Sequence, residues 1–344
     1  MASVDTGPGK KALEAGLLAW LLTSLLVVVI VLDPNAASAS SPLQLHGALQ
    51  REVGVGIVAH RGAAALAPEN TLSAFRIAIE QGADFVETDV QLTADGVPVL
   101  MHDPKLDRTT DGRGALASHT LEQVRRLDAG AWFSAEFAGE PVPTFEEFVE
   151  LIDPAPTRAF VELKGEWPAD RVGAAVDLLR ARHLSHRVIL ASFERETLEA
   201  VRELAPEYAT ILLTRELDRG VVDYAVGLRV SAVCARDELL ASQPARLREL
   251  GQAGIGTIAY TLNTERQWRR AAELGVDFFV TDDPPALTAW RDSLEEERLE
   301  ADGPDAARLR TIPPAARCRE SPARRDGGLE LLRVGYTRVD INTV

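Results

Sequence analysis

Short apolar runs alternate with longer amphipathic stretches along the chain from Gly56 to about Arg291. Each apolar run has the length of a single β-strand, and the stretches between them carry apolar residues at the spacing of a helix face. Such alternation is typical of a parallel sheet covered by helices. The predicted strands are Ile57–His60, Phe85–Gln91, Val97–His102, Ala159–Leu163, Val188–Ser192, Thr210–Leu213, Arg229–Cys234, Thr257–Leu262 and Phe278–Thr281, and the predicted helices include Thr71–Gln81, Asp170–Arg182, Glu194–Leu204, Pro244–Ala253 and Glu265–Leu274.

The third predicted strand departs from this rhythm. Only residues 92–96 separate it from the second strand, which is too short for the crossover that parallel neighbours require. The connection also contains the turn-forming pair Asp95-Gly96. We therefore predict that Val97–His102 returns antiparallel to the second strand as a hairpin, which leaves eight of the nine strands parallel.

Eight parallel strands separated by helices predict an α/β fold, a (β/α)8 TIM barrel with an additional hairpin strand. An open doubly wound sheet is the alternative. The regular repetition disfavours it, because such a sheet has a point at which the strand order reverses. Residues 103–158 interrupt the repetition and are interpreted as a small insertion over the barrel mouth.

The amino-terminal segment has the pattern of an export signal. Two lysines precede the apolar run Ala15–Leu32, and Ala37-Ser38-Ala39 follows it. Because this run is longer than that of most signal peptides, an uncleaved membrane-anchoring helix is the alternative. In both cases we expect the remaining chain to be exported to the cell envelope, either secreted or associated with the membrane through residues 15–32. The predicted organisation is a signal peptide or anchor at 1–39, a linker at 40–55, the barrel at 56–291 and a mostly disordered tail at 292–344.

The composition is that of a globular protein, with 46% of the 344 residues hydrophobic and 26% charged. The formal net charge of -15 disfavours a nucleic acid as partner, because phosphate backbones bind clustered lysine and arginine. It does not disfavour a small phosphate ester, since a bound divalent cation can reverse the local charge. The net charge thus disfavours one class of partner without selecting another, and the sequence leaves the oligomeric state open.

Carboxylates at alternate strand positions are the first candidates for chemistry. Glu87 and Asp89 point to the same face of their strand. Two buried carboxylates require a compensating cation, and oxygen ligands suit Mg²⁺ or Ca²⁺. An outward-facing pair in solvent is the alternative. On another strand, Glu162 and Lys164 share a face and offer a third carboxylate and a cation for a phosphate oxygen, with a simple ion pair as the alternative.

Two histidines, His60 and His102, stand at the carboxyl ends of predicted strands. In a barrel these ends converge on one mouth, where histidines suit acid–base catalysis near neutral pH. Arg61 follows His60 and offers a bidentate fork for a phosphate. Asp103 either orients the ring of His102 or caps a turn, and Asn263 either belongs to the site or caps the following helix.

The ordered motifs resemble those of the glycerophosphodiester phosphodiesterase family over roughly residues 56–290. Each motif is weak by itself, and the set in this order and spacing is specific. The matching motifs are His60-Arg61-Gly62, Pro68-Glu69-Asn70-Thr71, Glu87-Thr88-Asp89-Val90, Thr93-Ala94-Asp95-Gly96, Pro98-Val99, His102-Asp103, Glu162-Leu163-Lys164, Ser192-Phe193, Thr261 with Asn263, and Thr281-Asp282-Asp283-Pro284.

The resemblance implies a phospholipase-C-like TIM barrel with one divalent cation, Mg²⁺ or Ca²⁺, at its mouth. Tyr260 stands where the family usually has tryptophan, which keeps an aromatic wall and changes the fit to the head group. The segment 103–158 is where family members differ, and we expect it to influence substrate choice. The implied roles are metal binding for Glu87, Asp89 and Glu162, general acid and base for His60 and His102, phosphate binding for Arg61 and Lys164, and support of the metal or the glycerol for Glu69.

The activity that the resemblance implies is hydrolysis of glycerophosphodiesters to glycerol phosphate and an alcohol. A lysophospholipase D-type activity on lysophospholipids is one alternative, which an apolar amino-terminal segment near a bilayer would favour. A non-catalytic barrel that binds phosphodiesters is another alternative. It is disfavoured because every catalytic position of the motifs is present in the sequence.

Overall fold

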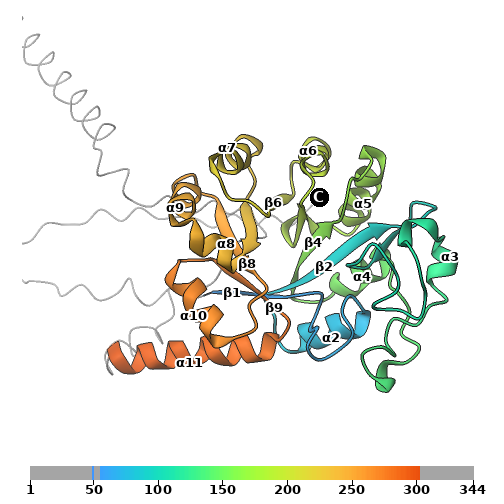
Figure 1. The fold of residues 1–344 in the computed structure, drawn as a ribbon, viewed down its shortest axis with the longest axis horizontal. Coiled ribbons are helices and arrows are strands. Elements are labelled where there is room, and N and C mark those ends of the chain that lie inside the picture. The colour runs from blue at the N-terminus through green and yellow to red at the C-terminus, as the bar shows by residue number, and fades with distance from the viewer. Residues whose placement is uncertain (1–48, 50–54, 303–344) are drawn as a thin grey trace, which may run out of the picture. The chain divides into compact units, whose positions relative to one another are not determined.

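Eight parallel strands close into a barrel in residues 49 and 55–302, the part of the chain that this computed structural model describes (Figure 1). Strand β1 pairs with both β2 and β9, which closes the sheet on itself. The predicted (β/α)8 barrel is therefore confirmed. Its strands are β1 (Gly56–Ala59), β2 (Phe85–Leu92), β4 (Arg158–Leu163), β5 (Val188–Ser192), β6 (Ala209–Leu213), β7 (Ala232–Arg236), β8 (Gly256–Tyr260) and β9 (Phe278–Thr281).

The short strand β3 (Pro98–Leu100) is the additional hairpin strand. It pairs antiparallel with β2, with Val90 opposite Leu100 and Leu92 opposite Pro98. The hairpin prediction is confirmed, and the strand is shorter than the predicted Val97–His102.

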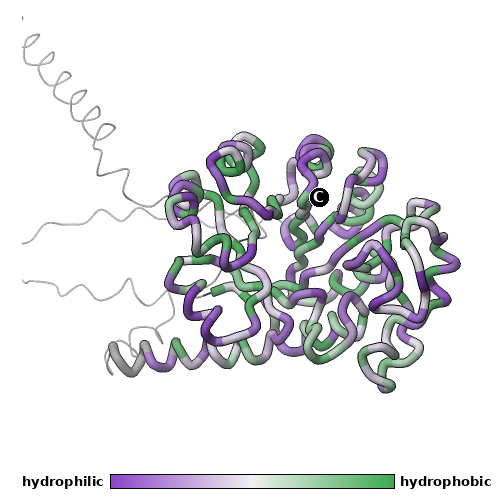
Figure 2. Tube along the Cα trace, in the orientation of Figure 1, coloured by the Kyte–Doolittle hydropathy of each residue, from purple (hydrophilic) through white to green (hydrophobic). Residues whose placement is uncertain are grey.

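Helices surround the barrel (Figure 1). Figure 2 shows hydrophobic residues along the strands and hydrophilic residues on the outer turns of the helices. Local capping sets where several helices begin: the Thr71 hydroxyl accepts a hydrogen bond from the Ala74 amide at the start of α2. The helices are α2 (Leu72–Glu80), α3 (Leu121–Val124), α4 (Phe145–Ile152), α5 (Ala169–Ala181), α6 (Arg195–Leu204), α7 (Arg219–Leu228), α8 (Asp237–Ser242), α9 (Pro244–Gln252), α10 (Glu265–Glu273) and α11 (Pro284–Asp302), with 3-10 turns at Leu116–Ser118, Ala135–Phe137 and Leu184–His186.

The interior of the barrel is filled by apolar side chains from successive strands. Phe85 and Phe278 pack edge to face with ring centroids 5.6 Å apart, and Leu49 and Val58 are buried in the same cluster. Burying one side chain of this kind stabilises the fold by roughly 1.5–3 kcal/mol. A packed interior leaves the mouth at the carboxyl ends of the strands as the place for a site.

The segment 103–158 is ordered and packs over its own apolar cluster, which includes Leu106, Leu116 and Val124. Its last part is a helix of the barrel wall, because α4 packs on α2 with the rings of Phe75 and Phe148 4.8 Å apart. The insertion therefore ends before α4, earlier than predicted. The sequence reason is a capping box at Thr144 and an apolar helix face behind it.

Two further boundaries differ clearly from the prediction. Strand β7 begins at Ala232, three residues later than Arg229, because Arg229 ends α7 in a left-handed conformation with φ 58°. Helix α11 continues to Asp302 through Leu, Glu, Arg and Ala, which favour helix, so the predicted disorder does not begin at residue 292. Residues 303–344, and the predicted signal and most of the predicted linker, lie outside the described residues.

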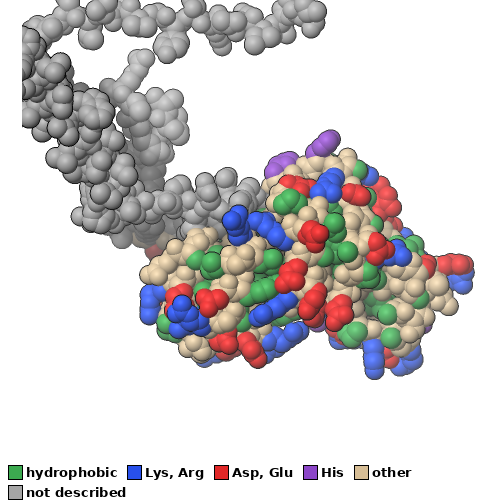
Figure 3. All heavy atoms as spheres, turned by 90° about the horizontal axis from the view of Figure 1, so that it is seen from above, with side chains coloured by type: hydrophobic (Ala, Val, Ile, Leu, Met, Phe, Trp, Pro, Cys, Tyr) green, Lys and Arg blue, Asp and Glu red, His purple; other side chains and the backbone are tan. Residues whose placement is uncertain are grey.

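The described helices include none that is long and apolar enough to cross a bilayer. Acidic and basic side chains lie interspersed with apolar ones on the face of the molecule seen in Figure 3.

Candidate active site

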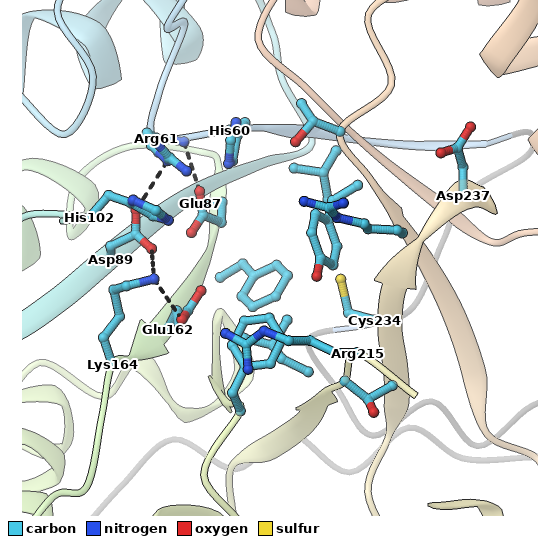
Figure 4. A pocket seen from close by; sticks show the side chains of 18 of the residues that line it. His60, Arg61, Glu87, Asp89, His102, Glu162, Lys164, Arg215, Cys234 and Asp237 are labelled. Atoms are coloured by element: carbon cyan, nitrogen blue, oxygen red, sulfur yellow. Dashed lines mark hydrogen bonds and ion pairs between the residues drawn. The ribbon is translucent and has the colours of Figure 1, made fainter. Parts of the chain in front are cut away.

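Strands β1, β2 and β4, with the segment that follows β3, bring seven of the predicted site residues to one cavity of about 960 Å³. Strand β2 is hydrogen-bonded to both β1 and β4, so the carboxyl ends of these three strands are neighbours in the barrel wall. Figure 4 shows the side chains projecting into the same side of the cavity. They are His60, Arg61, Glu87, Asp89, His102, Glu162 and Lys164.

Three carboxylates form a buried cluster at the centre of this group. Glu87, Asp89 and Glu162 each offer an oxygen within 4.8 Å of the others, and only 4%, 1% and 8% of the three residues is exposed. Asp89 and Glu162 are register partners on adjacent strands, and Glu87 shares a strand face with Asp89. The alternative of an outward-facing pair in solvent is therefore wrong.

The charges of the cluster are not balanced by the protein alone. Burial raises the pKa of Glu87 well above its usual value, and the neighbouring charge of Asp89 adds to this rise. Burial and Asp89 likewise raise the pKa of Glu162 to about 7. The pKa of Asp89 is lowered, because Lys164 and Arg61 outweigh its burial. The raised pKa values show that a negative charge on Glu87 and Glu162 is disfavoured unless a cation compensates it, and three converging carboxylates fit an oxygen-ligated divalent ion.

Lys164 lies within the cluster. Its Nζ donates hydrogen bonds to Glu162 Oε1 at 2.9 Å and to Asp89 Oδ1 at 3.1 Å. The lysine therefore bridges two strands, whereas the alternative interpretation had a simple Glu–Lys pair. Binding of a phosphate oxygen by Lys164 stays a prediction.

Arg61 is placed by a tight turn after β1. Its backbone is left-handed with φ 55°, and Gly62 follows with φ 82°, where a Cβ atom would lie 2.6 Å from the Ala74 carbonyl carbon. The Arg61 amide donates to Glu87 Oε2 at 2.7 Å, and Nη1 donates to Glu69 Oε1 at 2.7 Å. Arg61 is thus bound to carboxylates on two segments, and its predicted contact with a phosphate remains a prediction.

His60 is held by an aspartate that follows β9. Asp282 Oδ1 accepts a hydrogen bond from His60 Nδ1 at 2.5 Å, and Asp282 Oδ2 accepts one from Asn263 Nδ2 at 2.5 Å. Asn263 Oδ1 accepts in turn from the Asp282 amide at 2.9 Å. Asn263 therefore belongs to the site and does not cap α10, whose cap is Thr264.

His102 is held in the same manner from the insertion. Its Nδ1 donates to Asp103 Oδ1 at 2.7 Å, so Asp103 orients the ring. Arg108 donates from Nε to Asp103 Oδ2 at 2.7 Å and from Nη1 to Glu69 Oε2 at 2.6 Å. Burial lowers the pKa of His102, and the positive charges of Arg61 and Lys164 lower it further, which outweighs the opposite effect of Asp89.

Three residues of the site were given no role from the sequence: Arg108, Asp282 and Asn70. Asn70 Nδ2 donates to Asp89 Oδ2 at 2.9 Å. Its Oδ1 accepts from the Thr88 hydroxyl at 2.9 Å. The available signals were the motifs that contain Asn70 and Asp282, whereas Arg108 lies in a segment without a periodic pattern.

Comparison with known proteins agrees with the motifs. The model of the glycerophosphoryl diester phosphodiesterase family matches residues 60–286. A glycerophosphodiester phosphodiesterase from Caldanaerobacter subterraneus is 34% identical over 235 residues, which are 67% of this chain and 95% of that protein. A solved glycerophosphodiester phosphodiesterase from Agrobacterium tumefaciens has a TM-score of 0.60 at 29% identity, over 68% of this chain and 99% of its own.

A solved phosphodiesterase from Oleispira antarctica, in complex with the product sn-glycerol-3-phosphate, has a TM-score of 0.64 at 28% identity. The alignment covers 69% of this chain and 96% of that one. Fold, motifs and site geometry thus agree, and the chain belongs to the glycerophosphoryl diester phosphodiesterase family.

Proposed function

We propose that this protein hydrolyses glycerophosphodiesters to glycerol phosphate and an alcohol with the help of one divalent cation. The observation that carries this proposal is the pair His60 and His102, each backed by its own aspartate at the cavity that holds the three-carboxylate cluster. Family membership supports the same reaction.

Glu87, Asp89 and Glu162 would hold the cation. When bound, it would supply positive charge that stabilises the phosphoryl oxygens as the ester bond breaks. The ligands are all carboxylate oxygens, which suit Mg²⁺ and Ca²⁺ better than softer metals. We propose one of these two ions.

The two histidines move the protons. In both, Nδ1 donates to an aspartate, which fixes the tautomer and leaves Nε2 for the substrate. The lowered pKa of His102 favours the neutral ring, which is the form that accepts a proton. We assign His102 as the base that takes a proton from the nucleophile and His60 as the acid that protonates the departing alcohol. Arg61 and Lys164 would place their positive charges next to the phosphoryl oxygens.

An assay with and without metal tests this function. Purified protein should release glycerol phosphate from glycerophosphocholine, lose this activity with a chelator and regain it with Mg²⁺ or Ca²⁺. Lysophosphatidylcholine in the same assay separates the lysophospholipase D-type alternative. A protein that binds these diesters without turnover under any metal condition contradicts the proposal and favours the non-catalytic barrel.

We further propose that the protein acts outside the cytoplasm, either anchored by residues 15–32 or released after cleavage near residue 39. The support is the order of lysines, apolar run and small residues in the sequence. Fractionation of expressing cells and amino-terminal sequencing of the mature protein test both forms. Full-length protein in the cytoplasmic fraction contradicts the proposal.

A further inference from the structure

The cavity has a second wall, which the proposed chemistry does not use. Arg215 follows β6, Arg236 ends β7, and Phe193 and Tyr260 lie at the ends of β5 and β8. In Figure 4, Arg215 and Cys234 lie across the cavity from His102 and Asp89. A diester bound at the carboxylate cluster would extend one of its substituents towards this wall.

The second wall carries positive charge without an internal counterion. The Arg215 guanidinium carbon lies 4.0 Å from the centroid of the Phe193 ring, which packs edge to face with Tyr260. Both Arg215 and Arg236 are exposed, and within the described residues neither forms an ion pair. The Phe193 ring orients the Arg215 guanidinium group and leaves its N–H donors free to bind a ligand.

Two acids, Asp237 and Glu238, also line this side of the cavity. Asp237 is 3% exposed and forms an ion pair with Arg270 of α10. Glu238 is exposed to solvent. Neither acid is within ion-pair distance of Arg215 or Arg236, so the charge of the two arginines remains available to a ligand.

We propose that Arg215 and Arg236 form a subsite for a second anionic group, a phosphate or a carboxylate, on an alcohol of the diester substrate. This inference rests on the proposed function and specifies its substrate class. Guanidinium groups pair with phosphate and carboxylate through charge-assisted hydrogen bonds. The same two charges oppose a quaternary ammonium, so choline esters are the poorer substrates.

Matched substrate pairs test the subsite in the metal-loaded protein. Glycerophosphoserine and glycerophosphoethanolamine differ by one carboxylate. Glycerophosphoglycerol and its derivative phosphorylated on the terminal hydroxyl differ by one phosphate. We expect kcat/KM to be about tenfold higher for the member of each pair that has the additional carboxylate or phosphate. Most of this difference should be a lower KM, since a charge-assisted hydrogen bond contributes on that scale. A preference in one pair alone supports the proposal and identifies the anionic group.

The double variant Arg215→Gln/Arg236→Gln should bring the ratio within each pair close to one. The variant Arg215→Lys/Arg236→Lys should keep part of the preference, because it keeps the charge. Arg248→Gln is the matched control, because this arginine is exposed on α9 and does not line the cavity. The substitution removes one positive charge, as does each of the two substitutions in the double variant. The control should leave each ratio unchanged.

Equal kcat/KM within both pairs for the wild-type protein overturns the subsite, and so does a preference that survives in the double glutamine variant. Both results leave the hydrolytic function intact. Absence of turnover with every diester and metal contradicts the proposed function itself, and the subsite with it.

Discussion

Arg108 Nε lies 2.7 Å from Asp103 Oδ2, and this contact couples the insertion to His102. The same guanidinium also donates two hydrogen bonds to Glu69, at 2.6 and 2.8 Å, and Glu69 accepts from Arg61. Through Arg108, the supports of His102 and of Arg61 form one network. The bonds to Arg108 hold the pKa of Asp103 well below its usual range, so Asp103 stays ionised as the partner of the ring.

Arg108→Gln should therefore act through His102 and lower kcat about tenfold, with a smaller change in KM. Loss of the cation lets Asp103 move and weakens its hold on the ring. Arg108→Lys should recover part of the activity, because it restores one charged donor. Arg113→Gln removes an exposed arginine from the same segment and should be neutral. If Arg108→Gln changes melting temperature but not kcat, its role is structural and not one of positioning.

Each histidine should be essential to turnover. His60→Ala and His102→Ala should each reduce kcat by a factor on the order of 100 or more, because general acid–base catalysis contributes on that scale. His186→Ala serves as the control, since this histidine is exposed and does not line the cavity. Near-normal turnover in either cavity variant removes that histidine from the mechanism.

Metal binding should strengthen as the pH rises through about 7. Burial raises the pKa of Glu162 to about 7. The stability that the metal-free fold gains from protonated Glu162 is therefore fully present below the ordinary pKa of a glutamate and is lost as the pH rises through the raised pKa of about 7. A cation must displace the same proton, so its affinity increases over that range. The rise in melting temperature on adding Mg²⁺ or Ca²⁺ should be larger at about pH 8 than at about pH 6.

Glu162→Gln provides the comparison, because glutamine cannot ionise. The metal-free variant should lose less stability than the wild type between about pH 5 and about pH 8. Metal-free curves of equal slope for the two proteins would mean that Glu162 does not titrate in this range.

The carboxylate cluster was predictable because it depends only on the alternation of side chains along a strand and on the arrangement of parallel strands in a barrel. Alternation along a strand places Glu87 and Asp89 on one face, and the convergence of parallel strand ends brings Glu162 to them. The histidines follow the same rule. All nine strands were also recognised, each overlapping its observed position, since each is an apolar run of strand length.

The supporting residues depend on chain paths that no periodic pattern encodes. Arg108 reaches Asp103 and Glu69 only because residues after β3 fold back over the mouth. Arg215 and Arg236 were not singled out, because their importance arises when barrel closure places β6 and β7 across the cavity from β2. Asn70 stands in a motif before the first helix, and its contact with Asp89 depends on a left-handed backbone conformation that no periodic pattern encodes.

Asn70 offers a test that separates backbone strain from hydrogen bonding. Its φ of 56° is a left-handed conformation that asparagine tolerates, glycine adopts freely and alanine adopts at a cost of about 1 kcal/mol. Asn70→Ala should therefore melt lower than Asn70→Gly, by a few degrees for a protein of this size. Both variants leave Asp89 without the Asn70 amide and should weaken metal affinity alike, measured by titration calorimetry. Equal melting temperatures for the two variants would exclude backbone strain at this position, whereas full metal affinity in Asn70→Gly would show that Asp89 is held without the amide.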